Sequence, residues 1–400
     1  MEHRRAAAGA AAAAALVVIA SATTASATDD PAPGGGEPIS TVAGQLDGPR
    51  QLSRYSGDRL VVAESDVGEV SSVDLASGEV STLLTGLGNV QGVDYGQRRL
   101  WIAVGEAGPP PEEEGDGGEA APTTEPPTEP PTEPPAEPPV DEVPSQVLIE
   151  ATPGGEVLRT FDLLQYELDN NPDDQVQFVP DENGDDQPVD ALSNPFSVLV
   201  QPGRVLVADA GANDVLAIDT ESGEISTFFV PPVVTDTPEC EAAENNPGTV
   251  GCDPVPTEMT KGPDGLLYLG TLGAEAPGAG RVYVLDQEGR QVDVIDGLTS
   301  VTGVAVDSEE TGYVSNVIEG APEGEEPPPD FDPTTVGDLT SITLEGDRST
   351  AQVTMPTGLE IVDDELYASA WSVASFLGIP SRGEVQRISD SVFVEDPATP

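Results

Sequence analysis

The sequence predicts an all-β protein, a six-bladed β-propeller with four antiparallel strands in each blade. Three observations predict this fold. The same succession of four short apolar segments recurs six times along the chain. Each copy spans roughly 40–50 residues, the length typical of a propeller blade. Within the copies apolar and polar residues alternate, as they do in half-buried strands.

We name the four strands of a copy A to D, outward from the axis of the ring. The A strands are expected to start near Pro49, Gln91, Pro195, Pro256, Thr302 and Pro356. The B strands are expected at Leu60–Ala63, Leu100–Val104, Val205–Ala208, Leu266–Gly270, Tyr313–Ser315 and Leu366–Ser369. The C strands are expected at Gly68–Asp74, Ser145–Ala151, Asn213–Asp219, Gly280–Asp286, Gly337–Thr343 and Gly383–Ser389. The A–B and C–D turns are short and rich in Gly, Asp and Ser, which suit tight hairpins.

The segment Ile39–Gly44 resembles a D strand, although it precedes the first copy. It matches Val80–Leu84 and Ile225–Phe229, and the first copy already has its own D strand. We therefore predict that Ile39–Gly44 is the outer strand of the sixth blade, where it closes the ring and leaves no open seam. The alternative is a free leader strand.

The N-terminus is typical of a secretory signal, predicted over residues 1–27. Arg4 and Arg5 form a basic start, Ala6–Ala20 is an apolar segment too short to span a bilayer, and Ala25–Ala27 is a small-residue cleavage site. We expect a secreted or extracytoplasmic, monomeric protein without a transmembrane segment.

Residues 28–37 are expected to be a flexible leader, residues 38–391 the propeller, and residues 392–400 a tail. A Pro/Glu-rich stretch, 109–144, is predicted to be a disordered loop between strands B and C of the second blade.

Other long segments also fall between strands D and A or between strands B and C. They are 165–193, 231–255, 319–336 and 371–382. In an antiparallel blade these connections all emerge on one face, and repeat folds often bind ligands on the face that bears their insertions. We predict that this face is the binding face; the alternative is that the insertions are neutral.

The two cysteines, Cys240 and Cys252, are predicted to form a structural disulfide, because free cysteine pairs are uncommon outside the cytosol. The alternative is a metal or redox pair. Their spacing is not that of a redox motif, and no partner ligands accompany them.

The formal net charge of −58, with Lys261 as the single lysine, leaves no basic patch for nucleic acid. The acidity favours solubility in salt or at a cell envelope; the alternative is binding of Ca²⁺ or a cationic partner. The single histidine, His3, lies in the signal. The mature chain therefore lacks the imidazole that a Ser-His-Asp triad, a zinc-histidine site or a histidine-dependent lyase or lactonase requires.

The polar residues nearest the axis on the loop-bearing face are the candidate ligand-binding residues. They are Arg50, Gln91, Asn194, Thr257, Thr302 and Thr357. Asn194 has the alternative role of capping a turn. At the ends of three B strands, Glu64, Asp209 and Asn316 are spaced around the axis and form a candidate Ca²⁺ set; the alternative is that they are hydrogen-bonded strand ends.

A second candidate calcium motif begins at Asp181. The segment Asp181–Asp185 is similar to the opening of an EF-hand loop, but Asp186 replaces the glycine at the sixth position and Leu192 the glutamate at the twelfth.

Several segments resemble the ScyD/ScyE family of exported propeller proteins, and NHL-type and gluconolactonase-like propellers share part of the pattern. The resemblance spans residues 38–390, except for the insert at Thr124–Pro139. The matching segments are Tyr166–Asp173, Ser193–Val198, Val207–Asp214, Val255–Thr257, Gly262–Tyr268 and Gly280–Tyr283. The resemblance implies an exported propeller and supplies no catalytic residues. Gluconolactonase-like relatives imply an axial divalent metal held by carboxylates and Asn, whereas the corresponding ring here is mostly Thr.

Function follows from these patterns only in outline. We expect a non-catalytic binding or scaffold module that takes a small polar ligand, glycan or protein on the loop-bearing face, without a required cofactor. The alternative is a Ca²⁺-dependent hydrolase or lactonase that uses Glu64, Asp209 and Asn316. A third interpretation is an envelope spacer whose Pro-rich loop reaches other surfaces.

Overall fold

The computed structural model describes residues 38–106, 145–181, 183–322, 328 and 331–395. The predicted signal, leader and Pro/Glu-rich loop, and the end of the tail, lie outside these residues. Within them, no helix is long and apolar enough to cross a membrane.

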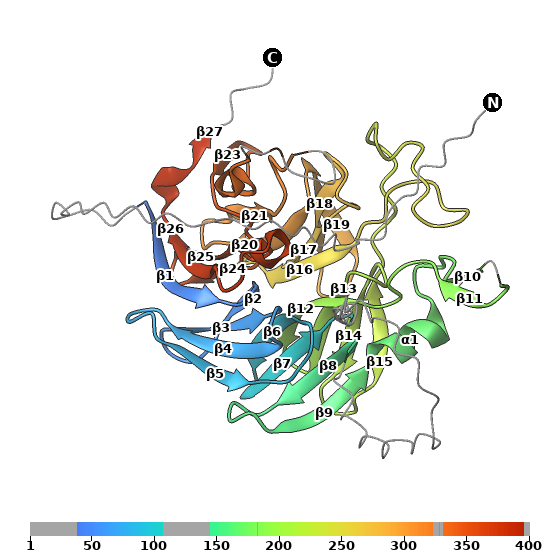
Figure 1. The fold of residues 1–400 in the computed structure, drawn as a ribbon, viewed down its shortest axis with the longest axis horizontal. Coiled ribbons are helices and arrows are strands. Elements are labelled where there is room, and N and C mark those ends of the chain that lie inside the picture. The colour runs from blue at the N-terminus through green and yellow to red at the C-terminus, as the bar shows by residue number, and fades with distance from the viewer. Residues whose placement is uncertain (1–37, 107–144, 182, 323–327, 329–330, 396–400) are drawn as a thin grey trace, which may run out of the picture.

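Six small antiparallel sheets follow one another around a central axis, and the predicted six-bladed propeller is confirmed (Figure 1). Blade 1 comprises β2 (Pro49–Arg54), β3 (Arg59–Glu64), β4 (Glu69–Asp74) and β5 (Val80–Leu84). Blade 2 comprises β6 (Val90–Gly96), β7 (Arg99–Val104), β8 (Val147–Ala151) and β9 (Val157–Asp162). Blade 3 comprises β12 (Pro195–Gln201), β13 (Arg204–Asp209), β14 (Asp214–Asp219) and β15 (Ile225–Phe229). Blade 4 comprises β16 (Pro256–Lys261), β17 (Leu267–Thr271), β18 (Gly280–Leu285) and β19 (Gln291–Leu298). Blade 5 comprises β20 (Val301–Val306), β21 (Gly312–Asn316), β22 (Asp338–Ile342) and β23 (Arg348–Ala351).

Blade 6 contains both ends of the ring. Its inner strands are β24 (Leu359–Val362), β25 (Glu365–Ala370) and β26 (Gly383–Ile388), and its outer strand is β1 (Ile39–Leu46). β1 pairs antiparallel with β26, from Ile39 opposite Ile388 to Leu46 opposite Gly383. The prediction that the N-terminal strand closes the sixth blade is confirmed.

Several elements are additions to the repeat, among them short 3-10 helices at Pro333–Thr335, Ala374–Leu377 and Asp390–Val392. Helix α1 (Leu163–Asn170) follows β9 and begins where the side chain of Asp162 accepts a hydrogen bond from the Gln165 N–H. A small hairpin, β10 (Phe178–Pro180) and β11 (Asp186–Pro188), follows α1 in the same D–A connection, before β12. Beyond residue 391, β27 (Val394–Glu395) pairs with β23 as a fifth strand of blade 5.

The core of the molecule is a ring of apolar clusters between neighbouring blades. The alternating side chains of each inner strand point to the two adjacent blades, so every blade contributes to two clusters. One cluster joins Val61 of blade 1 to Ile102 of blade 2, and another joins Leu60 of blade 1 to Val385 of blade 6. The second contains Leu46 of β1, so the closing strand is held by buried apolar area as well as by backbone hydrogen bonds.

Candidate functional site

The strand register brings the start of each A strand beside the end of the B strand on one face. Pro49 lies opposite Glu64, and Pro195 lies opposite Asp209. The D–A and B–C connections leave the blades at this end, which we call the loop face.

Three predicted ligand-binding residues link adjacent blades. The hydroxyls of Thr257, Thr302 and Thr357 are buried. They donate to the carbonyls of Val301 (2.9 Å), Pro356 (3.2 Å) and Pro49 (3.0 Å), respectively. Thr302 also lies 3.1 Å from the hydroxyl of Ser315, and Thr357 also donates to Ser372 at 2.8 Å, both within their own blades. A hydroxyl has one hydrogen to donate, so only in Thr257 is the hydrogen bond to the next blade the single one.

The other three predicted ligand-binding residues differ in their surroundings. Arg50 is buried, and its guanidinium lies 6.0 Å from the ring centre of Phe376. Gln91 donates to the hydroxyl of Ser65 at 3.2 Å. The Oδ1 atom of Asn194 accepts from the Glu106 N–H at 3.0 Å, and Asn194 borders the loop-face cavity described below.

The three predicted calcium ligands lie in separate blades. Glu64 accepts from the Asp47 N–H at 2.9 Å, and Asn316 donates to Thr340 at 3.0 Å. Asp209 is fully buried and accepts from the hydroxyl of Ser193 and from three backbone N–H groups. Burial raises the pKa of Asp209. Calcium binding by this set stays a prediction. Across the described ranges, no three His, Cys, Asp or Glu side chains are grouped so that they could hold a metal.

A cavity of about 430 Å³ opens on the loop face between blades 2, 3 and 4. Four connections form its wall: the D–A connections after blades 2 and 3, and the B–C turns of blades 3 and 4. The polar residues of the wall are Glu167, Asp173, Gln175, Gln177, Asp190, Asn194, Asn213, Asn245, Asn246, Asp253 and Glu275. Its volume lies in the range of small-molecule sites.

Amide side chains hold the carboxylates of the wall in place. Gln177 donates to Glu167 Oε1 at 2.9 Å, and Gln175 donates to Asp253 Oδ1 at 3.0 Å. Asn213 donates to Asp173 Oδ2 at 3.2 Å. These bonds connect the two D–A connections to each other and to the B–C turn of blade 3, so three of the four connections are joined by side-chain hydrogen bonds.

Several buried oxygens of this region have no hydrogen-bond partner within the described part of the chain. They are Glu167 Oε2, Asn171 Oδ1, Gln175 Oε1 and both carboxylate oxygens of Asp214. All five are acceptors when the carboxyl groups of Glu167 and Asp214 are ionised. Leaving a buried acceptor without a donor costs about 1–3 kcal/mol, more when it is charged.

Burial also changes the acidity of these carboxyl groups. It raises the pKa of Glu167 to about 7, although the hydrogen bond from Gln177 opposes the shift. Burial raises the pKa of Asp214 well above its ordinary value, and the nearby carboxylates of Asp209 and Glu167 add to the shift. The pKa of Asp253 is raised for the same main reason.

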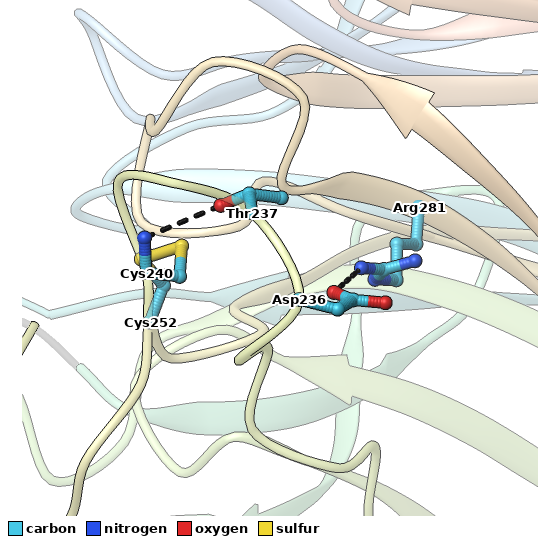
Figure 2. The surroundings of a disulfide bond; sticks show 5 residues. All are labelled: Asp236, Thr237, Cys240, Cys252 and Arg281. Atoms are coloured by element: carbon cyan, nitrogen blue, oxygen red, sulfur yellow. Dashed lines mark hydrogen bonds and ion pairs between the residues drawn. A yellow bond between two sulfur atoms is a disulfide. The ribbon is translucent and has the colours of Figure 1, made fainter. Parts of the chain in front are cut away.

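A disulfide joins Cys240 and Cys252 (Figure 2). Both lie in the connection after blade 3, other residues of which line the cavity. The Cα atoms are 5.1 Å apart, and the bond closes a loop over a sequence separation of 12. The Cys240 N–H donates to the Thr237 hydroxyl at 3.2 Å, and the mostly buried Arg281 of β18 pairs with Asp236. The predicted disulfide is confirmed, and it restrains the connection that contains Asn246 and Asp253.

A second cavity, of about 520 Å³, lies on the axis near the ends of the A strands, away from the loop face. Asp94, Glu258 and Glu360 border it. Glu258 Oε2 accepts from the backbone N–H groups of Val304 and Leu359, both at 3.1 Å. Burial raises the pKa of Glu360 to about 8. These carboxyl groups link the blades across the axis, and the sequence analysis did not identify them.

The residues of the loop-face cavity were also missed, apart from Asn194. Most of them lie in the two D–A insertions, which have no counterpart in the other copies, so the repeat alignment gave no position for them. The available signal was the density of Asn, Gln and Asp in 167–177 and 244–253, both in long D–A connections.

No protein family matches the sequence, and no curated protein does. Solved structures similar to this chain include the luciferin-regenerating enzyme, with 8% identity, 90% of this chain and 97% of that chain covered, and a TM-score of 0.49. A gluconolactonase from Xanthomonas campestris has 9% identity, coverage of 87% and 88%, and a TM-score of 0.48. Virginiamycin B lyase from Staphylococcus aureus has 11% identity, coverage of 90% and 88%, and a TM-score of 0.43.

Proposed function

We propose that this protein is a non-catalytic binding module that acts outside the cytoplasm and takes a small polar ligand in the loop-face cavity. The observation that supports the proposal is the construction of the cavity from four connections, three of them joined by side-chain hydrogen bonds. Such a site is formed before the ligand arrives, which reduces the entropy lost on binding. The disulfide in the connection after blade 3 supports a place outside the cytoplasm.

A ligand screen with a blocked cavity tests this proposal. The change is Ala210→Trp, which places a large ring at the cavity wall. Its matched control is Ala76→Trp in an exposed C–D turn, away from the loop face. Thermal shifts are measured with sugars, sugar acids, amino acids and amines. We expect at least one probe to stabilise the wild type and the Ala76→Trp variant but not the Ala210→Trp variant.

The screen contradicts the proposal if every stabilising probe acts equally on both variants. Circular dichroism of each variant checks that the ring still forms. The Ca²⁺-dependent lactonase stays the alternative. The lactonase is favoured over the binding module if the wild type hydrolyses gluconolactone only with Ca²⁺ and the Glu64→Ala/Asp209→Ala variant does not. Circular dichroism must show that this variant is folded.

We also propose membership of the ScyD/ScyE family. The segments that support it include Tyr166–Asp173, which contributes Glu167 and Asp173 to the wall of the cavity. A glycan or a protein as ligand, and the monomeric state, stay predictions.

A further inference from the structure

The wall of the loop-face cavity is acidic on several sides. Glu167 and Asp173 belong to the connection after blade 2, Asp253 to the connection after blade 3, and Glu275 to the B–C turn of blade 4. None of the lining residues is Lys, Arg or His. A ligand in this cavity therefore meets negative charge from three connections and no compensating side-chain cation.

Two polar side chains of the wall are almost fully buried and have an acceptor atom without a donor. Glu167 is 4% exposed and Gln175 is 8% exposed. The Nε2 atom of Gln175 donates to Asp253, which fixes the orientation of the amide and leaves Oε1 as the free atom. In Glu167, Oε1 is used by Gln177 and Oε2 is free. The missing groups are therefore hydrogen-bond donors.

We propose that the loop-face cavity binds a small ligand through one or more protonated amines. This inference rests on the proposed function and specifies the class of the ligand. An ammonium group donates three hydrogen bonds and has a positive charge, so it suits an acidic wall in which the buried atoms Glu167 Oε2 and Gln175 Oε1 have no donor. Carboxylates on several walls suit a ligand with more than one amine.

The arrangement of the carboxylates favours an amine over a bare metal ion. Calcium takes six to eight oxygen ligands at about 2.3–2.6 Å, which requires the ligands to converge on one point. No group of three His, Cys, Asp or Glu side chains converges in this way anywhere in the described ranges. An extended diamine or polyamine can instead place its separate nitrogens near separate carboxylates.

The acidity of the site supports a dependence of binding on pH. The groups around Glu167 are the Gln177 amide and the carboxylates of Asp173, Asp209 and Asp214. Burial raises the pKa of Glu167 to about 7, and a protonated carboxyl group attracts an ammonium group less. Affinity for an amine is therefore expected to fall as the pH decreases from 8 to 6.

Isothermal titration of the purified chain with spermidine, at about 0.15 M NaCl to screen the general acidity, tests the inference. The test variant is Glu167→Gln/Asp253→Asn, which keeps side-chain shape and removes two charges. The control is Glu221→Gln/Glu345→Gln, two exposed carboxylates in C–D turns on the other face. We expect one saturable site whose Kd rises roughly tenfold or more in the test variant and less than about twofold in the control.

Two outcomes overturn the inference: no saturable spermidine site, with or without saturable Ca²⁺ binding in its place, or equal losses of spermidine affinity in both variants. Butane-1,4-diol serves as the neutral probe. One result separates the two proposals: a neutral probe binds the wild type but not the Ala210→Trp variant, and spermidine does not bind. The proposed function then stands, and the amine inference fails. If no probe is sensitive to Ala210→Trp, the proposed function itself fails.

Discussion

At the scale of single residues, buried polar side chains near the axis connect blades that are far apart in the sequence. Gln51 of β2 donates to the Val198 carbonyl at 2.8 Å and accepts from the N–H groups of Val93 and Val198, both at 3.0 Å. A single amide thus joins blades 1, 2 and 3. The inner strands have one edge without a neighbouring strand, and Gln51 supplies partners for their free backbone groups.

We predict that Gln51→Ala lowers the free energy of unfolding by about 3 kcal/mol, because it leaves buried backbone groups without partners. The matched control is Gln352→Ala, an exposed glutamine that donates one hydrogen bond, to Gly337. We expect a loss below about 1 kcal/mol there. Chemical denaturation measures both; similar losses would show that Gln51 has no special role between the blades.

Glu167 is predicted to make stability depend on pH. Its pKa is raised from 4.5 to about 7 in the folded chain, so the folded state holds the proton more tightly than the unfolded state. Its stabilising effect is complete below about pH 4.5 and is lost as the pH rises to about 7. We expect Glu167→Gln to reduce the fall in the free energy of unfolding over this range by about 2 kcal/mol.

Denaturation at pH 5 and pH 8 measures this difference, with Glu221→Gln as the exposed control. An identical pH dependence of wild type and Glu167→Gln would contradict the assignment. Asp253 and Asp214 also have raised pKa values, so the wild-type chain is expected to be more stable at pH 5 than at pH 8 in any case.

At the scale of elements, β1 has the largest structural role relative to its length. It gives blade 6 its outer strand, and Ala43 and Leu46 are buried against blades 1 and 6. Without β1, the backbone edge of β26 is exposed and the apolar cluster between the first and last blades loses one side.

We predict that a chain beginning at Asp47 unfolds at a markedly lower temperature than one beginning at Pro38 and tends to aggregate. The chain that begins at Pro38 is the control: both chains lack residues 1–37, but only the control keeps β1. Differential scanning calorimetry and size-exclusion chromatography measure the two effects. Equal melting temperatures for the two chains would mean that the ring does not depend on this closure.

The sequence predicted the repeated elements better than the elements that occur once. Ile39–Gly44 was identifiable as a closing strand because its Ile-Ser-Thr phrase recurs in Ile225–Phe229. Helix α1 and β27 have no counterpart in other blades, and their positions depend on contacts with neighbouring elements. A helix of eight residues is marginal by itself, so its pattern alone is a weak signal.

The candidate site shows the same division. The loop face was predicted from strand direction, and Asn194 was identified as one of its residues. The carboxylates and amides of the cavity were not, because hydrogen bonds such as Gln175–Asp253 join residues 78 positions apart within insertions. Thr257 and Thr302 were predicted to lie near the axis, but the sequence could not show that their hydroxyls form hydrogen bonds to carbonyls of the next blade.

At the scale of the whole molecule, the net charge of −58 is expected to oppose the compact state through self-repulsion. We predict that raising NaCl from about 0.01 to 0.3 M increases the melting temperature by several degrees, because screening reduces this repulsion. Thermal unfolding followed by circular dichroism measures it. A melting temperature that is constant or falls over this range would contradict the prediction.

The ring and its loop face together define where a ligand is expected. Two of the cavities in the described structure differ in their surroundings: one lies on the axis among strands that link blades, and one lies off the axis among the connections of the loop face. In the axial cavity, Glu258 is engaged by two blades. In the loop-face cavity, Glu167 and Gln175 keep free acceptors, which favours this second place as the site.

Hydrogen–deuterium exchange with and without saturating spermidine tests this assignment most directly. We predict slower exchange in residues 167–177 and 244–255, which form the two main walls of the loop-face cavity, and unchanged exchange in the axial strand 49–54. Protection that appears in the axial strands, or that spreads evenly over the acidic surface, would contradict the location of the site.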